Sequence, residues 1–154
     1  MSDRGDREIV ELQLGRPPRA FLRVVRRCPY GRPAVTEQAP FDERGAPFPT
    51  TYYLTCRHLV AALSRLEAEG GVERWTRAAE SDERLASSLR EAHEEQRRLR
   101  PELPGGVGGA TREGSIKCLH AHAAFALARP GYVLGERILA EVEPLWPANG
   151  CCTA

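Results

Sequence analysis

The sequence predicts an α+β domain in which a small three-stranded antiparallel sheet packs with four to five helices. Short runs of β-branched and aromatic residues lie in the first third of the chain, with proline and glycine between them. After residue 56 the apolar residues recur every three to four positions, which is the helical period. Strands that come first and helices that follow them favour an α+β fold over an alternating α/β fold.

The N-terminal part of the chain predicts one short helix followed by a hairpin. Apolar residues spaced among charges over 6–14 predict a helix that ends before Gly15. The segments 21–25 and 33–36 have the composition of strands. Between them, residues 28–31 (Cys-Pro-Tyr-Gly) supply turn chemistry, so we expect the two strands to pair.

A third strand is predicted over 50–55, the segment with the best strand composition in the sequence. The loop that precedes it, 39–49, carries prolines at a spacing that excludes a helix. Tyr52 and Leu54 alternate with Tyr53 along the strand. Because successive side chains of a strand point to opposite faces, one of these two sets should face the core.

The rest of the chain predicts helices that are separated by glycine- and proline-rich breaks. The helix over 81–99 is mostly charged with a thin apolar stripe, so we expect it on the surface with His93 solvated. The segment 101–114 is rich in glycine and is expected to be mobile, and it lacks the Gly-Lys-Ser/Thr ending of a phosphate-binding loop. The expected helical ranges are 56–69, 72–79, 81–99, 115–129 and 134–145.

Length and composition indicate one globular domain over 1–146 and a flexible C-terminal tail over 147–154 that holds Cys151 and Cys152. Hydrophobic residues make up 42% and charged residues 28% of the 154, which excludes a disordered or collagen-like chain. The net charge of +1 and the lack of a long apolar stretch argue against nucleic acid and membrane as partners and leave a protein partner open. The polar N-terminus does not have the pattern of a signal peptide, so a cytoplasmic protein is expected.

Three of the five cysteines stand at predicted junctions between elements. Cys28 opens a turn, Cys56 closes a strand where a helix begins, and Cys118 precedes two histidines in Lys117-Cys118-Leu119-His120-Ala121-His122. Thiols in the cytoplasm stay reduced, and soft thiolates together with imidazoles are the ligands that zinc prefers. The sequence therefore predicts a zinc site of Cys28, Cys56, Cys118 and one histidine, with small buried thiols as the alternative interpretation.

Helical geometry leaves two histidines open as the fourth ligand. In a regular helix Cys118 and His122 lie four residues apart on one face, and His120 points to the other side. If the helix begins only at Cys118 or Leu119, its first turn lets Cys118 and His120 converge instead.

Cys56 is also the candidate catalytic residue. A thiol at a helix N-terminus has its pKa lowered by the unpaired backbone N–H groups and by the helix dipole. His58, His120 or His122 would then act as its base. This interpretation describes a small cysteine-dependent enzyme, with or without a metal.

Four sequence motifs follow one another along the chain: GRPP (15–18), RCPYGRPAV (27–35), PFPTTYYLTC (47–56) and KCLH (117–120). With these motifs the chain resembles domain of unknown function 501, a bacterial family found mostly in actinobacteria. The family has no assigned activity, so the resemblance implies no reaction. Its members usually have proline where this chain has Arg57, and a later histidine where this chain has Phe125. The second departure favours His120 over His122 as a ligand.

Two classes of function follow from the sequence. The first is a zinc-stabilised binding or regulatory module that is held together by the three cysteines and one histidine. The second is the small enzyme with a thiol nucleophile and a histidine base.

Overall fold

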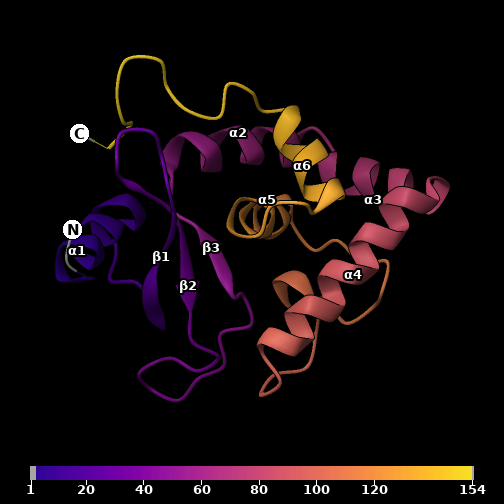
Figure 1. Cartoon of the computed structure of the whole chain (residues 1–154), viewed down its shortest axis with the longest axis horizontal. Coiled ribbons are helices and arrows are strands. Elements are labelled where there is room, and N and C mark those ends of the chain that lie inside the picture. The colour runs from indigo at the N-terminus through magenta and orange to yellow at the C-terminus, as the bar shows by residue number, and fades with distance from the viewer. Residues whose placement is uncertain (1–2, 154) are drawn as a thin grey trace.

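The structure, a computed structural model, describes residues 3–153 and has the predicted α+β fold (Figure 1). The N-terminal half forms a three-stranded antiparallel sheet in the order β1-β2-β3. The described residues contain six α-helices, which correspond to the six helical ranges that the sequence predicts. The elements of the first half are α1 (Asp3–Leu14), β1 (Phe21–Arg27), β2 (Pro33–Gln38) and β3 (Tyr52–Leu54).

The hairpin of β1 and β2 forms around the turn that contains Cys28, as the sequence predicts. The backbone N–H of Gly31 donates to the carbonyl of Cys28 at 3.0 Å, and the φ of Gly31 is +83°, a conformation that favours glycine. Helix α1 is attached to this hairpin by an ion pair between Arg27 and the buried Asp6, with two N–O distances of 3.0 and 2.7 Å. A buried carboxylate needs such a partner, so this pair fixes α1 against the sheet.

Strand β3 is shorter than the predicted segment 50–55, although its side chains alternate as expected. Tyr52 and Leu54 are buried in the core and Tyr53 is half-buried. The backbone N–H groups of Gln38 and Thr55 still bond across to the carbonyls of Thr51 and Ala34, so pairing continues at both ends of the strand.

Helix α5 lies at the centre of the molecule, between the sheet and the other helices of the second half (Figure 1). It is apolar nearly all round, which is typical of a buried helix. Eight of its ten residues are buried, and the two that keep partial exposure are His120 and Ala128. The elements of the second half are α2 (Arg57–Ala68), α3 (Gly71–Ser81), α4 (Glu83–Leu99), η1 (Val107–Gly109), α5 (Leu119–Ala128) and α6 (Val133–Ala140).

Two helices are shorter than predicted by four residues or more. Helix α5 begins at Leu119 and not at 115, because the carbonyl of Ser115 accepts a hydrogen bond from the ring of His93 and Cys118 has an extended backbone. Helix α6 ends at Ala140 and not at 145, since Pro144 disfavours helical backbone in the residue before it.

The expectation of a solvated His93 is wrong. The side chain is fully buried, its Nδ1 accepts a hydrogen bond of 2.9 Å from the backbone N–H of Val107, and its Nε2 donates to the carbonyl of Ser115 at 3.1 Å. At Gly106 an added Cβ would lie 2.1 Å from this ring, so glycine is needed for the close approach of the loop. The glycine-rich loop is thus anchored on α4, and its own residues Val107 and Ala110 are buried.

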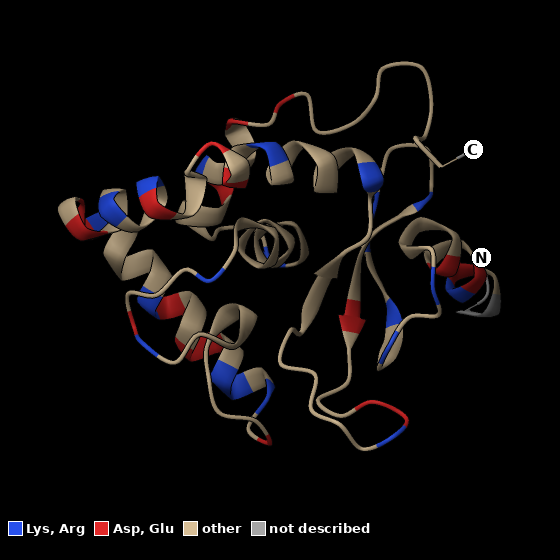
Figure 2. Cartoon of the chain, turned by 180° about the vertical axis from the view of Figure 1, so that it is seen from behind, with Lys and Arg blue, Asp and Glu red and all other residues tan. Residues whose placement is uncertain are grey.

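Acidic and basic residues are interspersed along α3 and α4, as Figure 2 shows. Pairs such as Arg98 with Glu95 and Arg90 with Glu83 place opposite charges next to each other on α4. Over residues 3–153, every helix is too short or too polar to cross a membrane.

Candidate functional site

Three side chains of ligand type converge where α5 begins. They are Cys118, which is the N-cap residue of α5, His120 in its first turn, and Glu67 in the last turn of α2. One ligand atom from each lies within 4.8 Å of the other two. Within residues 3–153 this is the group of three histidine, cysteine or acidic residues that comes close enough to hold a metal ion.

The carboxylate of Glu67 explains why α5 begins at this point. Its Oε2 accepts a hydrogen bond of 2.6 Å from the backbone N–H of Leu119, while the side chain of Cys118 makes no capping bond. A negative charge is favourable at the positive end of a helix, so Glu67 caps α5 from another element. The same oxygen lies 3.1 Å from Nδ1 of His120. The cap therefore also orients the histidine.

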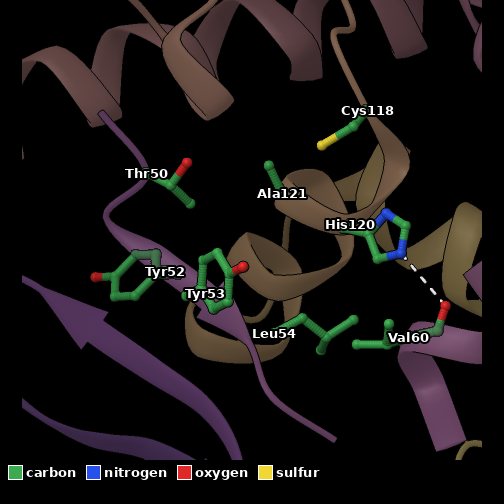
Figure 3. A pocket seen from close by; sticks show the side chains of 8 residues that line it. All are labelled: Thr50, Tyr52, Tyr53, Leu54, Val60, Cys118, His120 and Ala121. Atoms are coloured by element: carbon green, nitrogen blue, oxygen red, sulfur yellow. Dashed lines mark hydrogen bonds between the residues drawn. The ribbon is translucent and has the colours of Figure 1, made fainter. Parts of the chain in front are cut away.

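The other ring nitrogen of His120 faces α2. Its Nε2 lies 3.3 Å from the carbonyl oxygen of Val60, as the dashed line in Figure 3 shows, and 3.2 Å from Oγ of Ser64. The hydrogen bond with Cys118 raises the pKa of His120, burial opposes this, and the charge of Glu67 adds to the increase. The surroundings of His120 thus favour a positive charge at this position.

A pocket of about 330 Å³ borders the site, between β3, the side of α2 and the start of α5. In Figure 3 the sulfur of Cys118 points across the pocket toward Thr50, His120 lies on the right below Cys118, and Val60 lies at the lower right. The wall is mostly apolar, so Cys118 and His120 supply much of its chemistry. The lining residues are Thr50, Tyr52, Tyr53, Leu54, Val60, Cys118, His120 and Ala121.

The structure divides the predicted set of four ligands between two places. It brings Cys118 and His120 together, but Cys28 and Cys56 lie elsewhere, and no group within residues 3–153 joins all four ligand atoms within 4.8 Å. The reason is the length of α2. Cys56 precedes its first residue and Glu67 is near its end, so they lie about 16 Å apart along the helix axis at 1.5 Å per residue.

His122, the alternative histidine ligand, lies outside the site and in the core. Its side chain is fully buried, and its Nδ1 is 2.7 Å from the hydroxyl of Tyr132. Burial, together with the nearby His93, lowers the pKa of His122 to about 3. The pairing of Cys118 with His122 requires a regular helix through both residues, and Cys118 precedes the helix with extended backbone.

The surroundings of Cys56 do not fit the predicted nucleophile. The residue does stand at the N-terminus of α2, as expected, but only 3% of it is exposed. Burial raises the pKa of its thiol to about 11, although the backbone N–H groups of Leu59 and His58 act in the opposite direction. A nucleophilic thiol needs a lowered pKa, so desolvation outweighs the helix terminus here.

Sequence reasoning missed Glu67 as part of the site. It lies 51 residues before Cys118, within an ordinary charged helix end, and nothing in its local sequence distinguishes it from Glu69. It also set aside Cys151 and Cys152 as tail residues, whereas Cys152 Sγ lies 4.0 Å from Cys56 Sγ and Cys151 lies beside Cys28.

A sequence model of a family described as "Protein of unknown function (DUF501)" matches residues 24–105, which is more than half of the chain. The matched segment includes Cys28, Cys56 and Glu67 and ends before Cys118. No curated protein and no solved structure matches the chain.

Proposed function

The chain belongs to the DUF501 family, whose function is unknown, and we propose that it is a zinc-dependent binding module. In this proposal zinc is bound by Glu67, Cys118 and His120, and a ligand in the adjoining pocket completes its coordination. The observation that carries the proposal is the convergence of three side chains of zinc-ligand type, from two separate helices, at the wall of a pocket.

The donor set fits the chemistry of zinc. Thiolate sulfur, imidazole nitrogen and carboxylate oxygen all bind this ion, and three protein ligands with one open position are the arrangement of reactive zinc sites. Nε2 of His120 faces the carbonyl of Val60, so Nδ1, which lies 3.1 Å from Oε2 of Glu67 in the metal-free chain, is the nitrogen that would bind the metal. A histidine ligand usually donates its other N–H in this way, which fixes the orientation of the ring.

The pocket indicates the class of molecule that would bind. Its volume of about 330 Å³ is that of a small-molecule site, and its wall is formed mostly by Leu54, Val60 and two tyrosines. The metal would supply the single strong polar contact. We therefore propose a small apolar molecule that carries one anionic donor group, such as a carboxylate.

Metal analysis of the purified full-length chain tests this proposal. Zinc should survive dialysis, and Cys118→Ser and His120→Ala should each reduce it by one ion per chain. Ser64→Ala is the matched control, because Ser64 contacts His120 but offers no ligand, and it should retain the full zinc content. An unchanged zinc content in both ligand variants would contradict the proposal.

One observation favours a second candidate, a thiol-dependent enzyme. Cys118, His120 and Glu67 are arranged as thiol, imidazole and carboxylate, and Cys118 stands at a helix N-terminus with its sulfur in the pocket (Figure 3). In this case the purified chain would hold no metal at the pocket, and iodoacetamide would alkylate Cys118 faster than an ordinary thiol. His120→Ala should then slow the alkylation.

We propose a cytoplasmic location for the module. All five cysteines are free thiols, which supports a reducing compartment. Labelling the thiols in intact cells with a reagent that does not cross the membrane tests this: a cytoplasmic chain stays unlabelled until the cells are lysed, and labelling of intact cells would contradict it.

A further inference from the structure

Four cysteines from three distant segments meet where the C-terminal tail returns to the sheet. Cys28 lies in the turn between β1 and β2, Cys56 precedes α2, and Cys151 and Cys152 lie in the tail. Figure 1 shows the tail running from α6 back to the end of the β1–β2 hairpin, beside the start of α2. The sulfurs of Cys56 and Cys152 are 4.0 Å apart. Cys28 lies beside Cys151.

Two hydrogen bonds that do not involve sulfur direct the tail to this place. The hydroxyl of Tyr30 donates to the carbonyl of Pro147, and Nε2 of His58 donates to the carbonyl of Pro144 at 3.0 Å. Tyr30 stands two residues after Cys28, and His58 stands two residues after Cys56. The turn and the helix start that carry Cys28 and Cys56 therefore also position the segment that carries the other two thiols.

The start of α2 places backbone N–H groups beside two of these sulfurs, although burial raises the pKa of Cys56 in the metal-free chain. The backbone N–H groups of His58 and Leu59 point at Cys56, and that of His58 also points at Cys152. Such N–H groups and the positive end of the helix stabilise thiolates, which are the form that binds a metal.

We propose that Cys28, Cys56, Cys151 and Cys152 form a closed zinc site of four thiolates, which fastens the tail to the hairpin and to α2. The site is distinct from the pocket, since α2 separates the two. In the structure the sulfurs lie as two neighbouring pairs, which are linked because Cys151 and Cys152 are adjacent. No three of the four sulfurs lie within 4.8 Å of one another, so zinc binding requires the tail to bring the two pairs together. Sulfurs around tetrahedral zinc are about 3.8 Å apart, which follows from a bond length of about 2.3 Å. The separation of 4.0 Å in one pair is near this value, and the irregular tail provides the remaining movement.

Binding requires no oxidant. The zinc ion replaces the thiol protons, up to four of which pass to the solvent, and no sulfur changes its oxidation state. With all four positions filled by protein, such a site has a structural role and no open position for a substrate.

The test uses the full-length chain with Cys118→Ser and His120→Ala, which removes the pocket ligands, reconstituted with zinc ions alone. We expect one zinc per chain, with an X-ray absorption spectrum that shows only sulfur neighbours at about 2.3 Å. Adding Cys151→Ser and Cys152→Ser should abolish binding. Because both residues lie in the tail, circular dichroism should show an unchanged fold, so that the loss of zinc is not due to unfolding.

Three results would overturn the inference: a metal-free chain in the background that lacks the pocket ligands, a spectrum with nitrogen or oxygen neighbours, or a chain that is lighter by two hydrogens per cysteine pair, which indicates disulfides. The pocket proposal fails separately. It is contradicted when Cys118→Ser by itself leaves the zinc content of the parent chain unchanged.

Discussion

His120 and His122 stand two residues apart on α5 and meet opposite surroundings. His120 keeps about a quarter of its side chain exposed (25%) and faces Glu67 and Cys118, which favour a positive charge. His122 is fully buried between Tyr132 and His93, and its burial and the nearby His93 disfavour a positive charge. The pKa of His120 is therefore raised, mainly by Cys118, while burial lowers the pKa of His122 to about 3.

The difference follows from helical geometry on a helix that is buried nearly all round. Two residues correspond to a rotation of about 200°, so the two rings leave α5 on opposite sides. One side faces the pocket and the end of α2, where ligand atoms converge, and the other faces α4 and α6. Identical side chains thus lie at the wall of a pocket at one position and in the core two residues later.

The largest effect should come from removing the buried ring. His122→Ala leaves a cavity and an unpaired tyrosine hydroxyl, so we expect the free energy of unfolding to fall by about 2–4 kcal/mol. His120→Ala removes a partly exposed ring and should cost less than about 1 kcal/mol in the metal-free chain. Urea denaturation of both variants measures this, and equal losses would contradict the comparison.

The two histidines should also give the metal-free chain opposite responses to pH. The pKa of His122 is about 3 in the folded chain and 6.5 ordinarily, so its contribution to stability is complete above pH 6.5 and is lost as the pH falls toward 3. The limiting slope is about 1.4 kcal/mol per pH unit for one group. His120 has a raised pKa, so its contribution is present below pH 6.5 and is lost as the pH rises through its folded pKa.

Unfolding free energies between pH 4 and pH 8 separate these contributions. The loss of stability on the acid side should become shallower in His122→Ala and should persist in His120→Ala. An acid-side loss that is unchanged in His122→Ala would show that another group is responsible.

Much of the fold was predictable because its signals are local. The turn around Cys28, the alternation of Tyr52 and Leu54 and the break at Gly70 each depend on neighbouring residues, and the structure confirms the hairpin, the buried face of β3 and the separation of α2 from α3. His93 was misjudged because a polar residue in a charged helix resembles a surface residue. Its burial depends on Val107 and Ser115, which satisfy both ring nitrogens from a distant loop.

The site was predictable only in part, since its geometry depends on contacts that are remote in sequence. The sequence allows α5 to begin at 115 or near Leu119, and these alternatives pair Cys118 with different histidines. The carboxylate of Glu67 selects the later start, and with it His120. The positions of Cys151 and Cys152 depend in the same way on Tyr30 and His58, which are remote in sequence. Their side chains donate hydrogen bonds to backbone carbonyls of the tail beyond α6.

A smaller effect is expected from Tyr132→Phe, which removes the hydroxyl beside His122 and leaves the ring in place. The hydrogen bond of 2.7 Å is buried, so the variant should lose about 1 kcal/mol of stability. Ser64→Ala removes the corresponding hydroxyl beside the partly exposed His120 and should change stability by less than about 0.5 kcal/mol. Denaturation curves that show a larger loss for Ser64→Ala would reverse the roles assigned to the two histidines.

The smallest effect concerns the pKa of His120, which two neighbours raise. Glu67→Gln removes the negative charge but keeps an oxygen that accepts the N–H of Leu119, so α5 should begin at the same residue and the pKa should fall only slightly. Cys118→Ser removes the larger influence and should lower the pKa further. Titration of the ring proton signals by NMR in the metal-free chain measures both shifts. If the pKa stays unchanged in both variants, Cys118 and Glu67 do not interact with His120 in solution, and the convergence on which the metal site depends is absent.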